Sequence, residues 1–69
     1  MRLNNLKRIL DAESLTQVAI AARSGVSKST INKVYNQKRD VAPKTRSRIV
    51  RAINSFSENN YSIQDIFPE

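Results

Sequence analysis

The side chains best suited to chemistry in this sequence are basic, and they are concentrated in the middle of the chain. The 69 residues contain 12 Lys and Arg against 6 Asp and Glu, and nine of the basic residues lie within residues 23–51. Those nine are Arg23, Lys28, Lys33, Lys38, Arg39, Lys44, Arg46, Arg48 and Arg51. The same window holds one acid, Asp40, whereas residues 52–69 hold acids and no base. This concentration of cations indicates a face that binds a polyanion such as nucleic acid.

The composition argues against an enzyme or a metalloprotein. The chain has no Cys and no His, which removes disulfides, thiolate metal sites and the commonest general base. Asp11, Glu13 and Ser14 are close in sequence, but a helix end explains them better than a catalytic group. We therefore expect no enzymatic activity, no cofactor and no metal.

No apolar run approaches the ~20 residues of a membrane span, and the N-terminus lacks the apolar stretch of a secretory signal. We expect a cytoplasmic protein that does not contact the membrane.

The spacing of apolar residues predicts an all-α domain. One Gly and two Pro leave few helix breakers, and apolar residues recur at helical spacing instead of alternating. Leu3, Leu6 and Leu10, with Ile9 beside them, predict a first helix over residues 2–13. Further helices are predicted over residues 17–23, 28–36, about 43–56 and about 62–66. The expected architecture is a compact bundle of four to five short helices forming one domain, residues 1–69.

Several residues mark where these helices begin and end. Thr16 and Ser27 can cap the second and third helices, and Gly25 can end the second. Pro43 suits the first turn of the fourth helix, because that position has no intrahelical hydrogen bond to lose. Ser62, followed three residues later by an acid, resembles a weak capping box for the fifth helix.

Residues 17–36 have the pattern of a helix-turn-helix. Two helices that cross steeply at a short turn need a small residue where they nearly touch and a residue that tolerates positive φ. Ala21 and Gly25 meet these needs at the right separation. The positions that would anchor both helices are apolar, namely Ile20, Val26, Ile31 and Val34. An ordinary helical hairpin would also show Ala and Gly near a turn, but it would leave the basic window unexplained.

The motif resembles two families of DNA-binding regulators. The resemblance to the Cro/CI (XRE-like) family is carried by Leu15-Thr16-Gln17, Ala21, Ser24-Gly25-Val26-Ser27, Ser29-Thr30-Ile31, the preceding helix and residues 61–66. The resemblance to the LacI-type headpiece is carried by Val26-Ser27, Thr30, Val34, Asn36 and Val41-Ala42-Pro43-Lys44-Thr45-Arg46. A LacI-type headpiece begins near the motif, whereas here a predicted helix precedes the motif. Such a headpiece is also normally joined to a large sugar-binding domain, for which these 69 residues leave no room. We therefore favour Cro/CI. The resemblance implies a lambda-repressor-like fold with the helix-turn-helix at its second and third helices.

In this motif the helix over residues 28–36 lies in the major groove, with its N-terminal side chains facing base edges. The candidate base-reading residues on its outward side are Lys28, Ser29, Asn32 and Lys33. Lysine donates to guanine O6 and N7, and asparagine can pair with adenine. Plain phosphate contact stays open for Lys28 and Lys33.

Other polar side chains are candidates for phosphate contacts. By resemblance to both families, Gln17, Ser27 and Thr30 take this role. A second group, on the other side of the groove, comprises Asn36, Lys38, Arg39, Lys44 and Thr45. Arg46 is a weaker candidate, Arg48 and Arg51 are expected to be solvated or paired, and the role of Arg23 is left open in the same way.

One recognition helix reads only a few base pairs, so we expect a homodimer on a palindromic operator. The candidate interface residues are Ile66 and Phe67, in the C-terminal segment, for which a place in the core stays equally open, whereas Phe56 and Ile63 are expected to close the small core. Because so small a patch associates weakly, dimerisation on DNA alone stays open.

The sequence therefore predicts a Cro-like repressor that binds double-stranded DNA and has no evident small-molecule effector. The alternative is an antitoxin or antirepressor that uses the same fold chiefly to bind a protein. RNA binding has less support, because Tyr35 is the only aromatic residue in the basic window.

Overall fold

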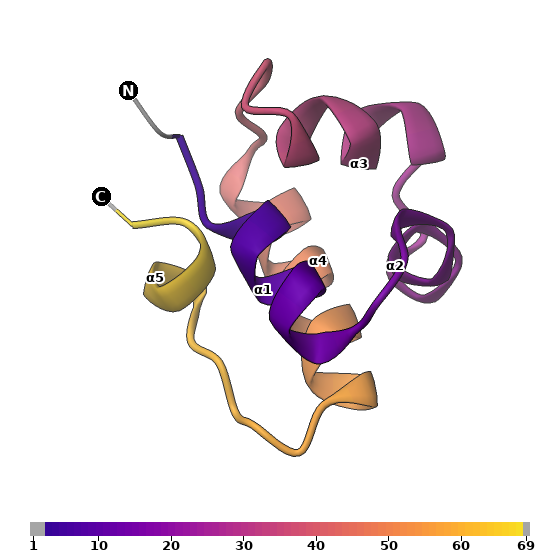
Figure 1. The fold of residues 1–69 in the computed structure, drawn as a ribbon. Helices are drawn as coiled ribbons and strands as arrows, with labels where there is room; N and C mark the ends of the chain where they lie inside the picture. The colour runs from indigo at the N-terminus through magenta and orange to yellow at the C-terminus, as the bar shows by residue number, and fades with distance from the viewer. Residues whose placement is uncertain (1–2, 69) are drawn as a thin grey trace.

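A computed structural model describes residues 3–68, and every regular element in that range is a helix. The helices are α1 (Leu6–Glu13), α2 (Gln17–Ser24), α3 (Lys28–Tyr35), α4 (Pro43–Phe56) and α5 (Ile63–Ile66). In the view of Figure 1, α1 and α4 occupy the centre, α2 and α3 lie to one side and α5 lies on the other. The predicted all-α bundle is confirmed.

The predicted helix ends agree with the observed ones to within one residue from α2 onward. The Thr16 hydroxyl accepts a hydrogen bond from the backbone N–H of Ala19, and Ser27 caps α3 in the same way. Gly25 ends α2 at φ 74°, and Pro43 is the first residue of α4. The capping box that begins at Ser62 is complete, with both reciprocal hydrogen bonds present.

The predicted start of the first helix is wrong. It was expected to begin at residue 2, which lies outside the described residues, but α1 begins at Leu6. The Asn4 side-chain oxygen accepts from the Leu6 N–H at 2.9 Å, and the Asn5 N–H donates to the Ile66 carbonyl at 2.7 Å. These bonds hold residues 3–5 in a non-helical conformation against the rest of the domain. Leu3 is consequently 38% exposed and does not belong to the core.

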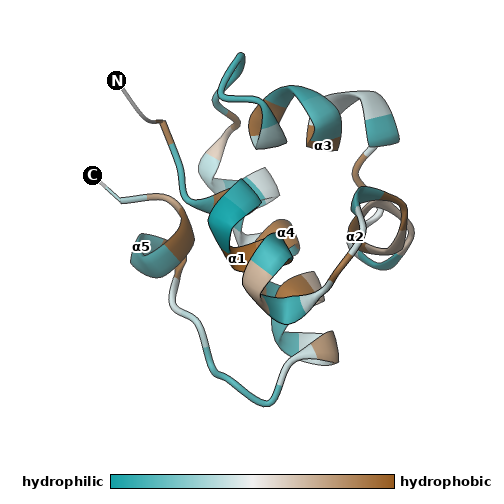
Figure 2. Cartoon of the chain, viewed as in Figure 1, coloured by the Kyte–Doolittle hydropathy of each residue, from teal (hydrophilic) through white to brown (hydrophobic). Residues whose placement is uncertain are grey.

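One apolar core lies between the helices, and each helix contributes to it (Figure 2). The residues of this core are Leu6, Ile9, Leu10, Ile20, Ile31, Val34, Ile49, Val50, Ala52, Ile53, Ile66 and Phe67. Helix α2 packs against α3 and α4, α1 packs against α3, and α5 packs against α4. The core thereby fixes the position of α3, which carries the candidate base-reading residues.

The burial of the C-terminal apolar residues differs from the prediction. Phe56 and Ile63, expected in the core, are 49% and 42% exposed, because they are the last residue of α4 and the first of α5. Ile66 and Phe67, expected at a dimer interface, are 0% and 2% exposed within a single chain. Their side chains are therefore core residues and are not available to a second subunit.

A hydrogen-bonded clamp joins the start of the chain to the end of α3. Gln37, at φ 62°, accepts at Oε1 from the backbone N–H groups of Leu3 and Asn4, at 2.7 and 3.0 Å. Its Nε2 donates to the Asn4 carbonyl at 2.9 Å and to Asn4 Oδ1 at 3.3 Å. Asn4, only 1% exposed, completes the clamp by donating from Nδ2 to the Val34 carbonyl at 3.0 Å.

Candidate nucleic-acid interface

Helix α3 has one buried face and one exposed polar face. Ile31 and Val34 are fully buried and attach the helix to the core. The four candidate base-reading residues, Lys28, Ser29, Asn32 and Lys33, are all exposed. The structure thus brings these four side chains together on one accessible surface, with the hydrogen-bonding capacity described above.

The turn between α2 and α3 sets the angle of the recognition helix. Gly25 adopts the left-handed conformation, and its N–H donates to the Ala21 carbonyl at 3.0 Å. A Cβ built at position 25 would meet nothing within 4 Å. The glycine is therefore required for its backbone conformation and not for space.

A side-chain hydrogen bond couples the two helices at their exposed surface. Asn32 Nδ2, on α3, donates to Gln17 Oε1, at the start of α2, at 3.0 Å. A candidate base-reading amide and a candidate phosphate-binding amide therefore restrain each other. Asn36, one turn beyond Asn32, donates from Nδ2 to the Asn32 carbonyl at 3.0 Å and so closes the end of the helix.

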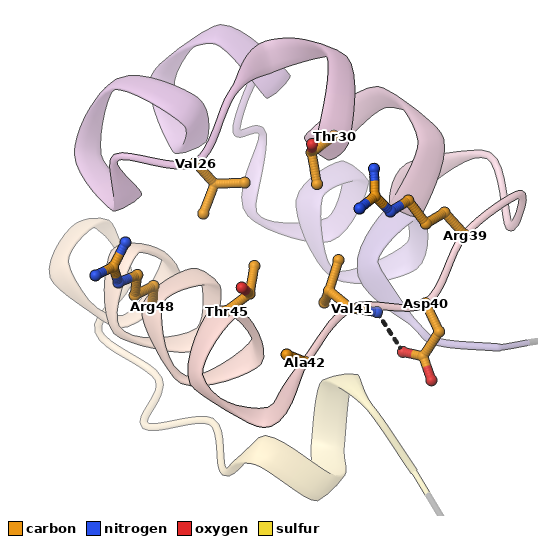
Figure 3. Close-up of a pocket in the computed structure, with 8 residues that line it drawn as sticks. All are labelled: Val26, Thr30, Arg39, Asp40, Val41, Ala42, Thr45 and Arg48. Carbon is orange, nitrogen blue, oxygen red and sulfur yellow. Dashed lines mark hydrogen bonds between the residues drawn. The ribbon is translucent and has the colours of Figure 1, made fainter.

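Two of the sequence segments expected to contact phosphate meet in one groove. Thr30 of α3, Arg39 of the following loop and Thr45 of α4 line it, together with Arg48 (Figure 3). The remaining lining residues are Val26, Asp40, Val41 and Ala42. Hydroxyl and guanidinium donors are the groups that bind phosphate oxygens in proteins, so this groove can hold a phosphate anion.

The other candidate phosphate-binding residues lie outside this groove. Ser27 donates from its hydroxyl to Thr30 Oγ1 at 2.9 Å, so it supports a groove residue. Lys38 is exposed in the loop after α3, and Lys44 is exposed in the first turn of α4.

Arg46 forms an ion pair with Asp40, the only acid within residues 23–51, and so compensates its negative charge. Its guanidinium pairs with Asp40 at 2.6 Å, donates from Nε to the Val41 carbonyl at 3.1 Å and lies over the Phe67 ring at 5.6 Å. The Val41 N–H and then Arg46 lower the pKa of Asp40, which keeps its carboxyl ionised. Asp40 is thus neutralised by a pair that also fastens the loop to α4.

Sequence reasoning placed Arg48 outside the candidate set, although it lines the groove of Thr30 and Thr45, and it missed the clamp formed by Asn4 and Gln37. Arg48 follows Lys44 by four residues on α4, so helical phase could have placed both on one face. The partnership of Asn4 with Gln37 joins positions 33 residues apart and has no sequence signal. By contrast, Asp11 and Glu13 lie in the last turn of α1, as the helix-end explanation expected, and they accept from the hydroxyls of Tyr35 and Tyr61.

An all-helical domain in which the second helix of a helix-turn-helix turns basic and amide side chains to solvent defines a class of DNA-binding proteins. Within that class, residues 16–62, more than half of the chain, match the family described as bacterial regulatory proteins, lacI family. The chain belongs to this family. It is therefore a DNA-binding regulatory domain and not an enzyme.

The preference for the Cro/CI family was wrong, since the family match supports the LacI resemblance alone. Helix α1, which favoured Cro/CI, lies outside the matched residues. No curated protein and no solved structure matches the chain. Among the described residues, no helix is long and apolar enough to cross a membrane.

Proposed function

We propose that this protein is a sequence-specific transcriptional repressor that inserts α3 into the major groove of an operator. The observation that carries the proposal is the exposed face of Lys28, Ser29, Asn32 and Lys33, opposite the buried Ile31 and Val34. A helix docks in the groove through such a face, and lysine and asparagine match the donor and acceptor patterns of guanine and adenine. We expect guanine in the half-site.

Phosphate contacts position α3 on the duplex. The groove of Thr30, Arg39 and Thr45 grips one stretch of backbone, and Gln17, Asn36, Lys38 and Lys44 add contacts around it. Two copies bind inverted half-sites about one helical turn apart, because one helix reads too few base pairs. With about four phosphate contacts in each subunit, the log–log salt slope of a bound dimer is about −7.

Selection of bound duplexes from a random DNA pool tests this function. We expect a palindrome whose half-sites contain guanine, and the absence of any enriched sequence would contradict the proposal. Lys33→Ala and Lys38→Ala then separate base reading from phosphate binding. Lys33→Ala should weaken the selected operator far more than random DNA, whereas Lys38→Ala should weaken both about equally. Equal losses on both DNAs for Lys33→Ala would remove Lys33 from the base-reading set.

A further inference from the structure

A stripe of cations runs along one face of α4, beginning at Lys44, which is expected to touch the operator, and continuing past it. Lys44, Arg48, Arg51 and Ser55 follow one another at intervals of four, three and four residues, which places them on one side of the helix. The three cations are exposed. The stripe from Lys44 to Arg51 is about 10 Å long, at about 1.5 Å per residue.

The far end of this stripe lines a second groove, between α2 and α4. The groove is formed by Arg23, Ser24, Arg48, Arg51, Ala52 and Ser55. Arg23 is held there by a hydrogen bond from Nε to Ser55 Oγ at 3.1 Å, and Ser55 in turn donates to the Ala52 carbonyl at 2.6 Å. Arg48 lines this groove and also the groove of Thr30 and Thr45, so the two grooves adjoin at this side chain.

The charge of the second groove is uncompensated. No acidic side chain lines it, and within residues 3–68 the one ion pair is that of Arg46 with Asp40. Three guanidinium groups around one groove repel each other, and an anion between them relieves that repulsion. The planar guanidinium donors of arginine fit phosphate oxygens in bidentate fashion.

We propose that Arg23, Arg48 and Arg51 bind the phosphate backbone of duplex DNA that flanks the half-site read by α3. This inference rests on the proposed function. The shared Arg48 favours DNA over an acidic protein, because it sets the second groove next to the first, which Thr30 of the recognition helix lines. A DNA strand carries one phosphate per about 3.4 Å of helix axis, so a stripe about 10 Å long follows about three phosphates.

The test compares two duplexes that carry the same selected operator. The short duplex ends at the outer edges of the half-sites, and the long duplex extends about one helical turn, roughly 10 base pairs, beyond each edge. The test variant is Arg23→Gln/Arg51→Gln, which leaves Arg48 of the first groove in place. The control, Lys7→Gln/Arg8→Gln, removes the same charge from exposed positions of α1. Fluorescence anisotropy gives the affinity at several salt concentrations, and circular dichroism checks that each variant is folded.

We expect wild type and the control to bind the long duplex more tightly than the short one, and the test variant to lose this advantage. Each lost phosphate contact lowers the salt slope by about 0.9, so the slope on the long duplex falls by about 1.8 per subunit. Two bound subunits double this difference to about 3.6, which between 50 and 200 mM salt amounts to about 150-fold in affinity.

Equal losses on the two duplexes would overturn the proposal, because the arginines would then act inside the half-site. Unchanged affinity on both would overturn it in favour of an acidic protein partner. Failure of the wild type to bind either duplex would overturn the proposed function and this inference together.

Discussion

The clamp between Gln37 and Asn4 gives the sharpest quantitative prediction for this fold. Gln37→Ala removes four hydrogen bonds that join the end of α3 to residues 3 and 4. The substitution leaves the backbone cost at position 37 unchanged, because glutamine and alanine both carry a Cβ and pay the same penalty at φ 62°. The measured effect is therefore that of the lost hydrogen bonds.

The magnitude follows from the exposure of these bonds. Each net hydrogen bond contributes about 0.5–1.5 kcal/mol, but the bond to Leu3 is exposed and one bond to Asn4 is long, at 3.3 Å. We therefore expect a loss of about 2–3 kcal/mol in the free energy of unfolding. For a domain of this size 1 kcal/mol corresponds to about 4–8 °C, so the Tm should fall by about 10–20 °C.

Thermal and urea unfolding followed by circular dichroism measures the loss. Gln64→Ala, at an exposed position of α5, is the matched control and should change the Tm little. A double-mutant cycle with Asn4→Ala reports the one bond between the two side chains, at 3.3 Å, and should give a coupling energy of about 0.5 kcal/mol. If Gln37→Ala and Gln64→Ala lower the Tm equally, the clamp does not stabilise the domain and the reasoning is refuted.

Three further predictions concern the turn, the acid response and the core. Gly25→Ala should lower the free energy of unfolding by about 1–2 kcal/mol, and Gly25→Asn should lower it less, because asparagine tolerates the left-handed conformation. Equal losses for the two variants in urea titrations would contradict the explanation from backbone conformation. Hydrogen bonds from Tyr61, Ser57 and Asn59 lower the pKa of Glu13 below its ordinary value of 4.5. The resulting stability is present above pH 4.5 and is lost as the pH falls through the lowered pKa, so the Tm of Glu13→Gln should depend less on acid than that of wild type. Ile66→Ala, a core truncation, should lower the free energy of unfolding by about 2–5 kcal/mol, whereas Phe56→Ala should lower it by less than about 1 kcal/mol. The reverse order in chemical denaturation would contradict the burial of Ile66.

The sequence predicted well those features that depend on residues close together in the chain, namely the helix ends and the two faces of α3. The caps Thr16, Ser27 and Ser62, together with Gly25 and Pro43, act within a few residues of their own positions, so helices α2 to α5 could be placed correctly. The division of α3 into a buried and an exposed face follows from helical phase alone.

The errors concern positions where distant contacts decide. The start of α1 depends on Asn4 and Asn5, whose partners lie at Val34, Gln37 and Ile66. The burial of Ile66 and Phe67 depends on how α5 folds back onto α4 and α1, which apolar spacing in a short segment cannot specify.

The family preference failed for a different physical reason. A helix-turn-helix needs the same small, apolar and capping residues in either family. Ala21, Gly25 and Val26 therefore indicate the turn but do not distinguish the LacI family from the Cro/CI family. The stretch from Val41 to Arg46 was the more informative signal. Its first residue, Val41, belongs to the loop that Arg46 fastens to α4, and Val41, Ala42 and Thr45 line the groove beside α3.

Helix α1 precedes the family match, yet the structure makes it part of the same cooperative unit as α3. It supplies Leu6, Ile9 and Leu10 to the core, and Asp11 accepts from the hydroxyl of Tyr35 at 3.0 Å. Burial of three such side chains contributes about 5–9 kcal/mol, whereas a domain of this length has a total stability of about 3–10 kcal/mol. A fragment of residues 16–69 should therefore be unfolded by circular dichroism and should not bind the operator. A cooperative thermal transition in that fragment would show that the matched segment folds by itself and that α1 is dispensable.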